Sequence, residues 1–209
     1  MSNSLFETIR SIVQQEIKQL RLGELGVVQE QHAHESDSDQ NNYSCTVALR
    51  DSQIVLKKVP IATGRLGMAA IPDVGDLVLV QFLNGNINAP VIVGSFYNDE
   101  DRPPVSSSGQ AVLQLPKGGS EGDGINIKAS SEDESALTIN VAGSVIVSLK
   151  DDDPAVEISV GDGSGVVTID SDGTVCVSSA TELNIKSDAD MNIEAGGTLN
   201  LKGSIVNIN

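Results

Sequence analysis

Two histidines are the first residues whose spacing could support metal chemistry. His32 and His34 are separated by one residue, and three copies of the chain around a common axis would bring their imidazoles together. They precede a polar stretch at 35–42, however, and no other type of metal ligand clusters with them in the sequence. We therefore predict that both histidines lie in an exposed loop and that the chain has no metal ligands.

Two short acidic segments could in principle bind calcium. Residues 161–163 (GDG) and 170–173 (DSDG) resemble fragments of calcium-binding loops, but they lack the full ligand set and the closing glutamate. Turn formation is the simpler interpretation, because Asp and Gly both favour tight turns. The run of aspartates at 151–153, before Pro154, is predicted to be a solvated bulge where one turn lengthens.

No set of residues suggests catalysis. Gly118 and Gly119 lack the Lys-Ser/Thr pair of a phosphate-binding loop, and no nucleophile, base and orienting group occur together. Cys176 alternates with Val175 and Val177, so it should face outward and have no chemical role. We predict a protein that is not an enzyme, with no catalytic residues and no cofactor.

The composition excludes further classes. Asp and Glu outnumber Lys and Arg by 29 to 13, and the net charge of −16 argues against nucleic acid as a partner, since its phosphates would repel the chain. The N-terminus does not resemble a signal peptide, and no apolar run approaches the ~20 residues of a membrane helix. With only two cysteines in unrelated regions, assembly in a reducing cytoplasm is expected.

The elements that must position the functional residues fall into four ranges. Residues 1–23 carry apolar side chains at spacings of three and four, which predicts a short amphipathic helix. Its apolar stripe needs cover, either from the body of the same chain or from copies of the helix. Residues 24–104 read as short alternating strands separated by turns, which predicts a small closed or sandwiched β domain. Residues 105–124 are rich in Ser and Gly and are predicted to be a linker.

The last range, 125–209, repeats every eight residues. Each unit has about five residues of alternating strand and about three of turn, and paired apolar residues recur in steps of eight. The last of these pairs, which we predict to line the interior of a prism, are Leu183, Ile185, Met191, Ile193, Leu199 and Leu201.

Two architectures fit this repeat. One is a monomeric β-solenoid; the other is an intertwined trimer, in which each chain gives one strand per layer to a triangular β-helix. We favour the trimer, because one copy has no second layer to cover its apolar face. The predicted fold is therefore mainly β: a short helix, a small barrel and a C-terminal trimeric β-prism.

The segment 71–104 resembles a known family. Its spacing, turn residues and strand pattern are similar to the oligonucleotide/oligosaccharide-binding (OB) fold of baseplate assembly protein V and VgrG-like central spike proteins of contractile tails. Residues 47–64 also suit the earlier strands of that fold. The matching positions are Pro72, Gly75, Asp76, Gly85, Pro90, Gly94, Tyr97 and Asn98.

The resemblance implies a homotrimer at the centre of a baseplate, in a virion or particle tail, with a hub protein above the OB-fold. Its function would be to pierce the host outer membrane when the sheath contracts. Some relatives carry a lysozyme domain, for which residues 105–124 leave no room, and others bind iron through a C-terminal His-x-His pair, which this chain lacks. We therefore expect a blunt prism that docks a small PAAR-like tip protein. The docking residues would be Ile205, Val206, Asn207, Ile208 and Asn209. The alternative is a secreted monomeric β-solenoid that acts as a binding module or adhesin.

Overall fold

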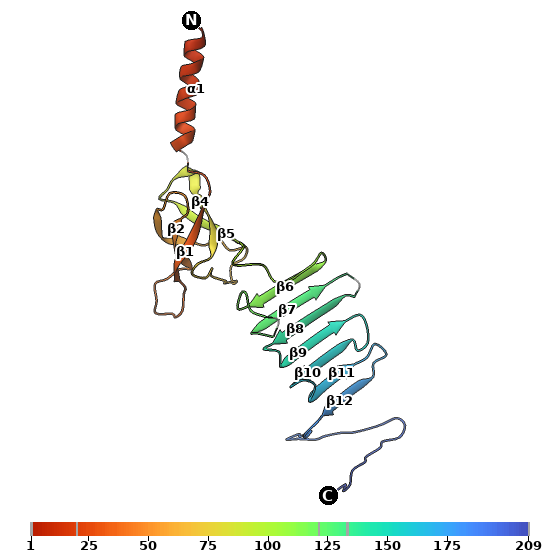
Figure 1. Ribbon diagram of the computed structural model, residues 1–209. Helices are drawn as coiled ribbons and strands as arrows, with labels where there is room; N and C mark the ends of the chain where they lie inside the picture. Colours follow the sequence, from red (N-terminus) through yellow and green to blue (C-terminus); the bar gives the residue numbers. More distant parts are fainter. Residues whose placement is uncertain (1, 20, 121, 133, 209) are drawn as a thin grey trace. The chain divides into compact units, whose positions relative to one another are not determined.

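The computed structural model describes residues 2–19, 21–120, 122–132 and 134–208. The chain is mainly β, with one N-terminal helix and two antiparallel sheets (Figure 1). It divides into two compact units, 1–105 and 106–209, and each is described by itself. No helix within the described residues combines the length and apolarity needed to span a bilayer.

The first unit begins with the predicted amphipathic helix and continues as a five-stranded sheet in the order β3-β2-β1-β4-β5. Helix α1 spans Ser2–Gln19, inside the predicted range 1–23. The other elements are β1 (Glu24–His32), β2 (Ser44–Leu49), β3 (Val55–Pro60), β4 (Leu77–Phe82), the short 3-10 helix η1 (Leu83–Gly85) and β5 (Pro90–Phe96).

This sheet curls upon itself. The ladders β1–β2, β2–β3 and β4–β5 each contain a bulge, and a bulge bends the strand that carries it. The bending brings the two edge strands together, where Ile61 forms a parallel bridge with Ile92 and the Ala62 N–H donates to the Ile92 carbonyl at 2.8 Å. Among the described residues no longer ladder joins these edges. The predicted barrel is therefore not closed: the described strands form a curled sheet whose edges meet at this bridge. A partly open barrel of this kind is typical of OB-folds.

The core of the first unit lies inside this curl and follows from strand alternation. In β4, Val78, Val80 and Phe82 are buried, whereas Gln81 between them is exposed. The core is completed by Val28, Cys45, Val47, Leu49, Val59 and Ile92. Burial raises the pKa of the Cys45 thiol, so this cysteine behaves as a small apolar core residue.

The second unit is one seven-stranded sheet in which every strand pairs with its neighbour in sequence. Figure 1 shows these strands side by side in chain order. They are β6 (Gln110–Leu115), β7 (Ile125–Ser130), β8 (Ala136–Val141), β9 (Val145–Lys150), β10 (Val156–Val160), β11 (Gly165–Ile169) and β12 (Val175–Ser179).

Two expectations for this unit need correction. Strand β6 lies inside the range 105–124 that we expected to be a linker, so the sheet begins at Gln110 rather than at Ile125. The described backbone also forms no β-helix, because β6–β12 pair within the chain as a meander. Short turns with positive φ cause this: Ala142 and Gly143 (φ 51° and 68°) reverse the chain so that β9 returns alongside β8.

Candidate functional site

The candidate site of the second unit is one apolar face of its sheet. The ladder registers align aliphatic residues into three parallel rows across all seven strands, because alternate residues of a strand point to the same face. The flanking rows are interrupted only at Gly165 and Ser179. The central row consists of Leu113, Ile127, Ile139, Val147, Ile158, Val167 and Val177.

No other described residue of the second unit covers this face. Leu113, Ile158 and Val177 of the central row are 52%, 40% and 53% exposed, and large aliphatic residues of the flanking rows are exposed as well. The opposite face is mostly polar; there Cys176 pairs with Thr168, as the alternation predicted. A continuous apolar patch of this extent marks an interaction surface in a folded protein. The geometry thus defines a docking face rather than a catalytic pocket.

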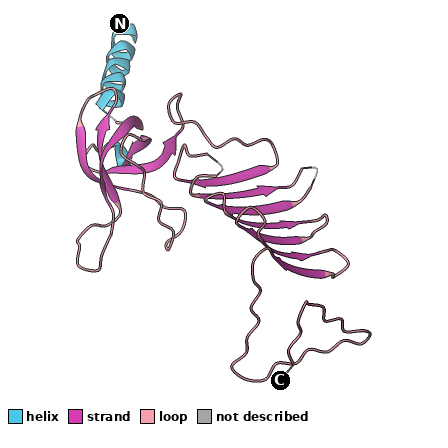
Figure 2. Cartoon of the chain, turned by 60° about the horizontal axis from the view of Figure 1, so that its bottom comes forward, coloured by secondary structure: helices cyan, strands magenta, loops and turns pink. Residues whose placement is uncertain are grey.

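The chain beyond β12 keeps the eight-residue period without forming strands. The backbone bends at 180–181, 188–189, 196–197 and 204–205, with no helix or strand between the bends (Figure 2). Two of these bends share one hydrogen-bond pattern. The Ser179 hydroxyl donates to the Glu182 carbonyl at 3.1 Å, and the Ser187 hydroxyl donates to that of Asp190 at 3.2 Å. The repeat is therefore a property of the backbone and not only of the sequence.

The predicted prism interior lies in this segment. Its six residues, given above, are 45–72% exposed, from Met191 at the low end to Ile185 at the high end. Within the described part, residues 181–208 make no backbone–backbone hydrogen bond. The single chain thus presents apolar side chains here on a backbone that forms no ladder, and the interior role of these residues stays a prediction.

The predicted tip-docking residues are exposed where the structure describes them. Ile205 and Ile208 are 78% and 84% exposed and Val206 is 50% exposed, while Asn207 is also at the surface. Asn209 lies outside the described residues. Their docking role also stays a prediction.

The residues that carried the family resemblance hold the turns of the curled sheet. Gly75 adopts φ +97°, which favours glycine, and its N–H donates to the Val28 carbonyl at 2.9 Å, which fastens the turn to β1. The Asp76 carboxylate accepts a hydrogen bond from the Asp73 N–H at 2.8 Å. The Pro72 carbonyl accepts one from the Gln31 side chain at 2.8 Å.

The remaining resemblance residues mark the last two strands. Gly85 ends η1 with φ +72°, Pro90 begins β5 and Gly94 lies within it. After β5, the Asn98 side chain accepts hydrogen bonds from the N–H groups of Glu100 and Asp101, both at 2.8 Å, whereas Tyr97 is 66% exposed. These residues shape the fold, and they converge on no cavity among those the described residues form.

The prediction that both histidines lie in an exposed loop is wrong for His32, which ends β1 with a side chain only 12% exposed, and holds for His34. The two histidines also have separate partners. His32 Nε2 lies 2.8 Å from the Thr46 hydroxyl, and His34 Nδ1 lies 3.0 Å from an Asp39 carboxylate oxygen. The contact with His34 and three backbone N–H groups hold the pKa of Asp39 well below its usual range. Within the described residues, no group of three His, Cys, Asp or Glu is placed to hold a metal ion.

The acidic clusters form turns, and some of these turns are tied to one another. Asp151 accepts a hydrogen bond from the Ser135 N–H at 3.0 Å, and Asp153 accepts one from the Ser171 N–H at 2.7 Å. The bulge predicted at 151–153 therefore bonds to the turns before and after it. The Ser171 N–H lowers the pKa of Asp153, and the Thr174 N–H lowers that of Asp172. Strand pattern alone gave no signal for these bonds, because they join residues sixteen and eighteen positions apart.

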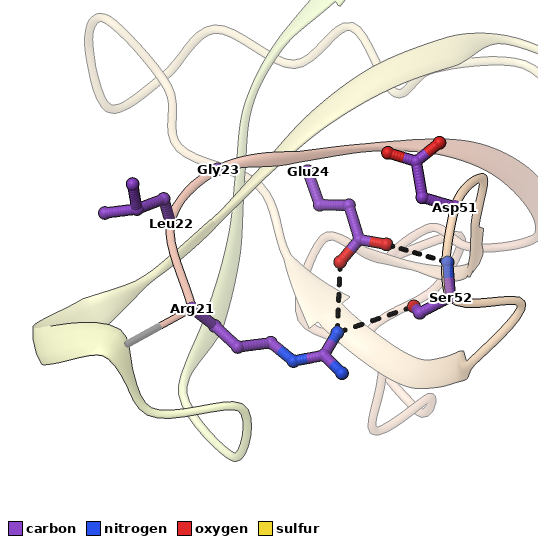
Figure 3. Close-up of a pocket in the computed structure, with 6 residues that line it drawn as sticks. All are labelled: Arg21, Leu22, Gly23, Glu24, Asp51 and Ser52. Atoms are coloured by element: carbon purple, nitrogen blue, oxygen red, sulfur yellow. Dashed lines mark hydrogen bonds and ion pairs between the residues drawn. The ribbon is translucent and has the colours of Figure 1, made fainter. Parts of the chain in front are cut away.

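A shallow cleft lies where β1 begins, lined by Arg21, Leu22, Gly23, Glu24, Asp51 and Ser52 (Figure 3). Arg21 Nη1 lies 3.0 Å from one carboxylate oxygen of Glu24, and the Ser52 N–H donates to the other at 3.0 Å. The same Arg21 nitrogen donates to the Ser52 hydroxyl at 3.4 Å. These groups satisfy one another, so the cleft ties the start of β1 to the β2–β3 turn.

The fold and these features define a mainly β protein that pairs a curled five-stranded domain with an open, one-sided apolar sheet. Comparison with protein families agrees: residues 49–97 match the family described as the Type VI secretion system/phage-baseplate injector OB domain. The sequence resemblance is thereby confirmed, and these residues are the injector OB domain of the baseplate protein V-like family.

Membership of this family gives the coarse function. The chain is a component of a phage-baseplate or type VI injector, and such a component associates with other tail proteins. The family is structural and typically non-enzymatic.

Proposed function

We propose that the chain is the central spike of a contractile tail, a homotrimer that pierces the host outer membrane when the sheath contracts. The observation that carries this proposal is the bare apolar face of β6–β12. Three such sheets can pack their apolar faces inward around a three-fold axis while their polar faces meet water. Burial of an aliphatic side chain stabilises by about 1.5–3 kcal/mol, so three facing sheets supply a large driving force.

The pairing within β6–β12 changes the predicted prism in one respect. Intertwining of chains can begin only after Ser179, since the strands before it already pair within their own chain. The Ala180 N–H still bonds to the Ser164 carbonyl, but the described residues 181–208 make no backbone–backbone hydrogen bond and could pair with neighbouring copies. In this arrangement the pairs at 183/185, 191/193 and 199/201 line the interior. Strand pairing between copies would give a rod from which no chain can dissociate unless the strand pairs along the rod are broken.

Two further partners belong to the proposal. The exposed Ile205, Val206 and Ile208 offer an apolar end surface, which suits docking of a small PAAR-like tip protein. A hub protein would bind at the injector OB domain within the assembled baseplate. Neither a nucleic acid nor a cofactor takes part.

The monomeric solenoid is disfavoured by the sheet itself. A solenoid winds its strands into closed coils around its own core, whereas the described β6–β12 form a single layer with one bare apolar face. A secreted binding module would also have to keep that face exposed to water.

The test is the mass of the purified full-length chain in native buffer, measured together with two variants. The wild type should have about three times 21.8 kDa. Val147→Asp places a carboxylate in the central apolar row and should abolish the trimer, whereas Ser148→Asp on the opposite face should leave it intact. A monomeric wild type would refute the proposal. Injector particles carrying Val147→Asp should in addition fail to permeabilise outer-membrane vesicles.

A further inference from the structure

The helix α1 carries an apolar stripe that no other described residue of the first unit covers. Phe6, Ile9 and Ile12 are 79%, 52% and 54% exposed, and Leu5 and Val13 on the same side of the helix are exposed as well. Spacings of three and four residues place these five side chains on one face. Ile9 and Val13 lie near the middle of the stripe, one turn apart.

This helix needs a partner in order to be stable. Helix α1 has 18 residues, and most helical stability in proteins comes from packing of an apolar face rather than from intrinsic propensity. The stripe is therefore an interaction surface. Several different surfaces could cover it: the sheet of its own chain, another tail protein or copies of α1.

The charge of α1 favours copies of itself. The whole chain has a net charge of −16, but within α1 the acidic Glu7 and Glu16 are balanced by Arg10 and Lys18. Copies of this segment can therefore approach without the mutual repulsion that the rest of the chain imposes.

The chain next to α1 also favours copies. Only a few residues separate Gln19 from the first residue of β1, and one of them, Arg21, is bonded to Glu24 and Ser52. In the trimer proposed above, these short tethers would hold three helices close together. Their effective concentration would be on the order of millimolar, which promotes their association.

We propose that the α1 helices of three copies pack together through the stripe formed by Leu5, Phe6, Ile9, Ile12 and Val13, as a second trimer contact separate from the β6–β12 faces. This inference rests on the proposed trimer. It gives the assembly a helical clamp in the first unit, whose stability does not depend on strand pairing in the second.

The test combines native mass with hydrogen exchange on the full-length protein. In the wild-type trimer, the amides of α1 should exchange on the order of 100-fold more slowly than in an unfolded segment. The double variant Ile9→Asp/Val13→Asp should remove most of this protection. Ser11→Asp/Gln15→Asp is the matched control: it adds the same charges at the same spacing on the opposite side of the helix and should keep the protection.

The outcomes separate this inference from the proposed function. If all three proteins are trimers and only the Ile9/Val13 variant loses α1 protection, the helical clamp is supported. A wild-type trimer with unprotected α1 would overturn the clamp and leave the spike intact, with the stripe open to another tail protein. Equal protection in all three trimers would overturn it as well. Protection of α1 in a monomer would show packing on its own chain and would refute both proposals.

Discussion

The two sheets of this protein differ in how their apolar faces are shielded from water. In β1–β5, bulges curl the sheet until its apolar residues face one another, and Val47, Val78 and Val80 are fully buried within one chain. In β6–β12, the described ladders run without a register shift, and the apolar face stays open. Strand alternation is similar in both sheets, so the difference lies in the curvature of the backbone.

The comparison teaches that alternation specifies an apolar face but not what covers it. A curled sheet covers its own face and is stable as one chain, whereas a flatter sheet must find its cover in other molecules. The injector OB domain thus uses its apolar residues for its own fold. The second unit, as we propose, uses them for assembly.

The largest effect is expected in the closed core. Val80→Asp would bury a carboxylate without a partner and should destabilise the first unit by roughly 4 kcal/mol or more. Hydrogen exchange of the β4 amides measures this loss, and Gln81→Asp on the exposed side of the same strand is the control. Because this core lies within one chain, the loss should not depend on protein concentration. A loss that dilution enhances would show that the first unit also relies on other copies.

The next effect tests the segment beyond β12. Ile193→Asp would place three carboxylates around one axis of the proposed trimer, where they are desolvated and repel one another. Asn192→Asp, on the adjacent outward position, should be nearly silent. Resistance of the trimer to denaturing detergent without boiling measures the difference. Equal loss in both variants would mean that the strand faces are assigned the wrong way round.

A smaller effect is expected at one turn of the curled sheet. Gly75→Ala introduces a side chain at φ +97° and should cost about 1–2 kcal/mol, because L residues rarely adopt this conformation. Gly94→Ala in β5 is the control, since no atom lies within 4 Å of an added Cβ there. Urea denaturation followed by a signal from the first unit measures both. Equal midpoints for the two variants would show that the turn is not under conformational constraint.

The smallest effect is expected from acid pH, on the turns that contain Asp153 and Asp172. The pKa of Asp153 and of Asp172 is lowered in the folded chain by N–H donors from Ser171 and Thr174. A lowered folded pKa means that the stabilisation is present above the ordinary aspartate range and is lost as the pH falls through the folded pKa. Below about pH 4, the amides of the turns at 151–154 and 170–174 should therefore lose protection, measured as the exchange rate relative to that of an unfolded peptide at the same pH. The Asp153→Asn variant should show this loss of protection already at pH 7. An unchanged amide exchange rate in the variant would contradict a stabilising role for the hydrogen bond from the Ser171 N–H to Asp153.

Much of the first unit could be predicted from the sequence. The stripe of α1 and the alternation in β2, β4 and β5 each specify an element, and Gly75 and Asn98 specify turns because their backbone roles demand those residue types. The curl of this sheet and its incomplete closure were harder to predict, because they depend on bulges. A bulge shifts the register by one residue and leaves almost no signal in composition.

The second unit was predicted in its period but not in its pairing. The eight-residue repeat specifies where strands and bends fall, and the bends at 188–189 and 196–197 follow it. The repeat does not specify whether a strand pairs with its own chain or with another, because both arrangements use the same alternation. Strand β6 was missed because its alternating residues, QAVLQL, lie between Ser- and Gly-rich stretches that dominated the interpretation.

The meander of β6–β12 has a consequence for the order of events during synthesis. Each strand pairs with the one made just before it, so this sheet is rich in local contacts, which form fast in folding chains. Among the described residues, 181–208 make no backbone pair of this kind within their own chain. We expect a rapid first-order phase that forms the sheet in single chains, followed by a slower phase that scales with concentration. Stopped-flow circular dichroism at several dilutions would reveal both phases, and a strand signal that rises only with the concentration-dependent phase would contradict this order.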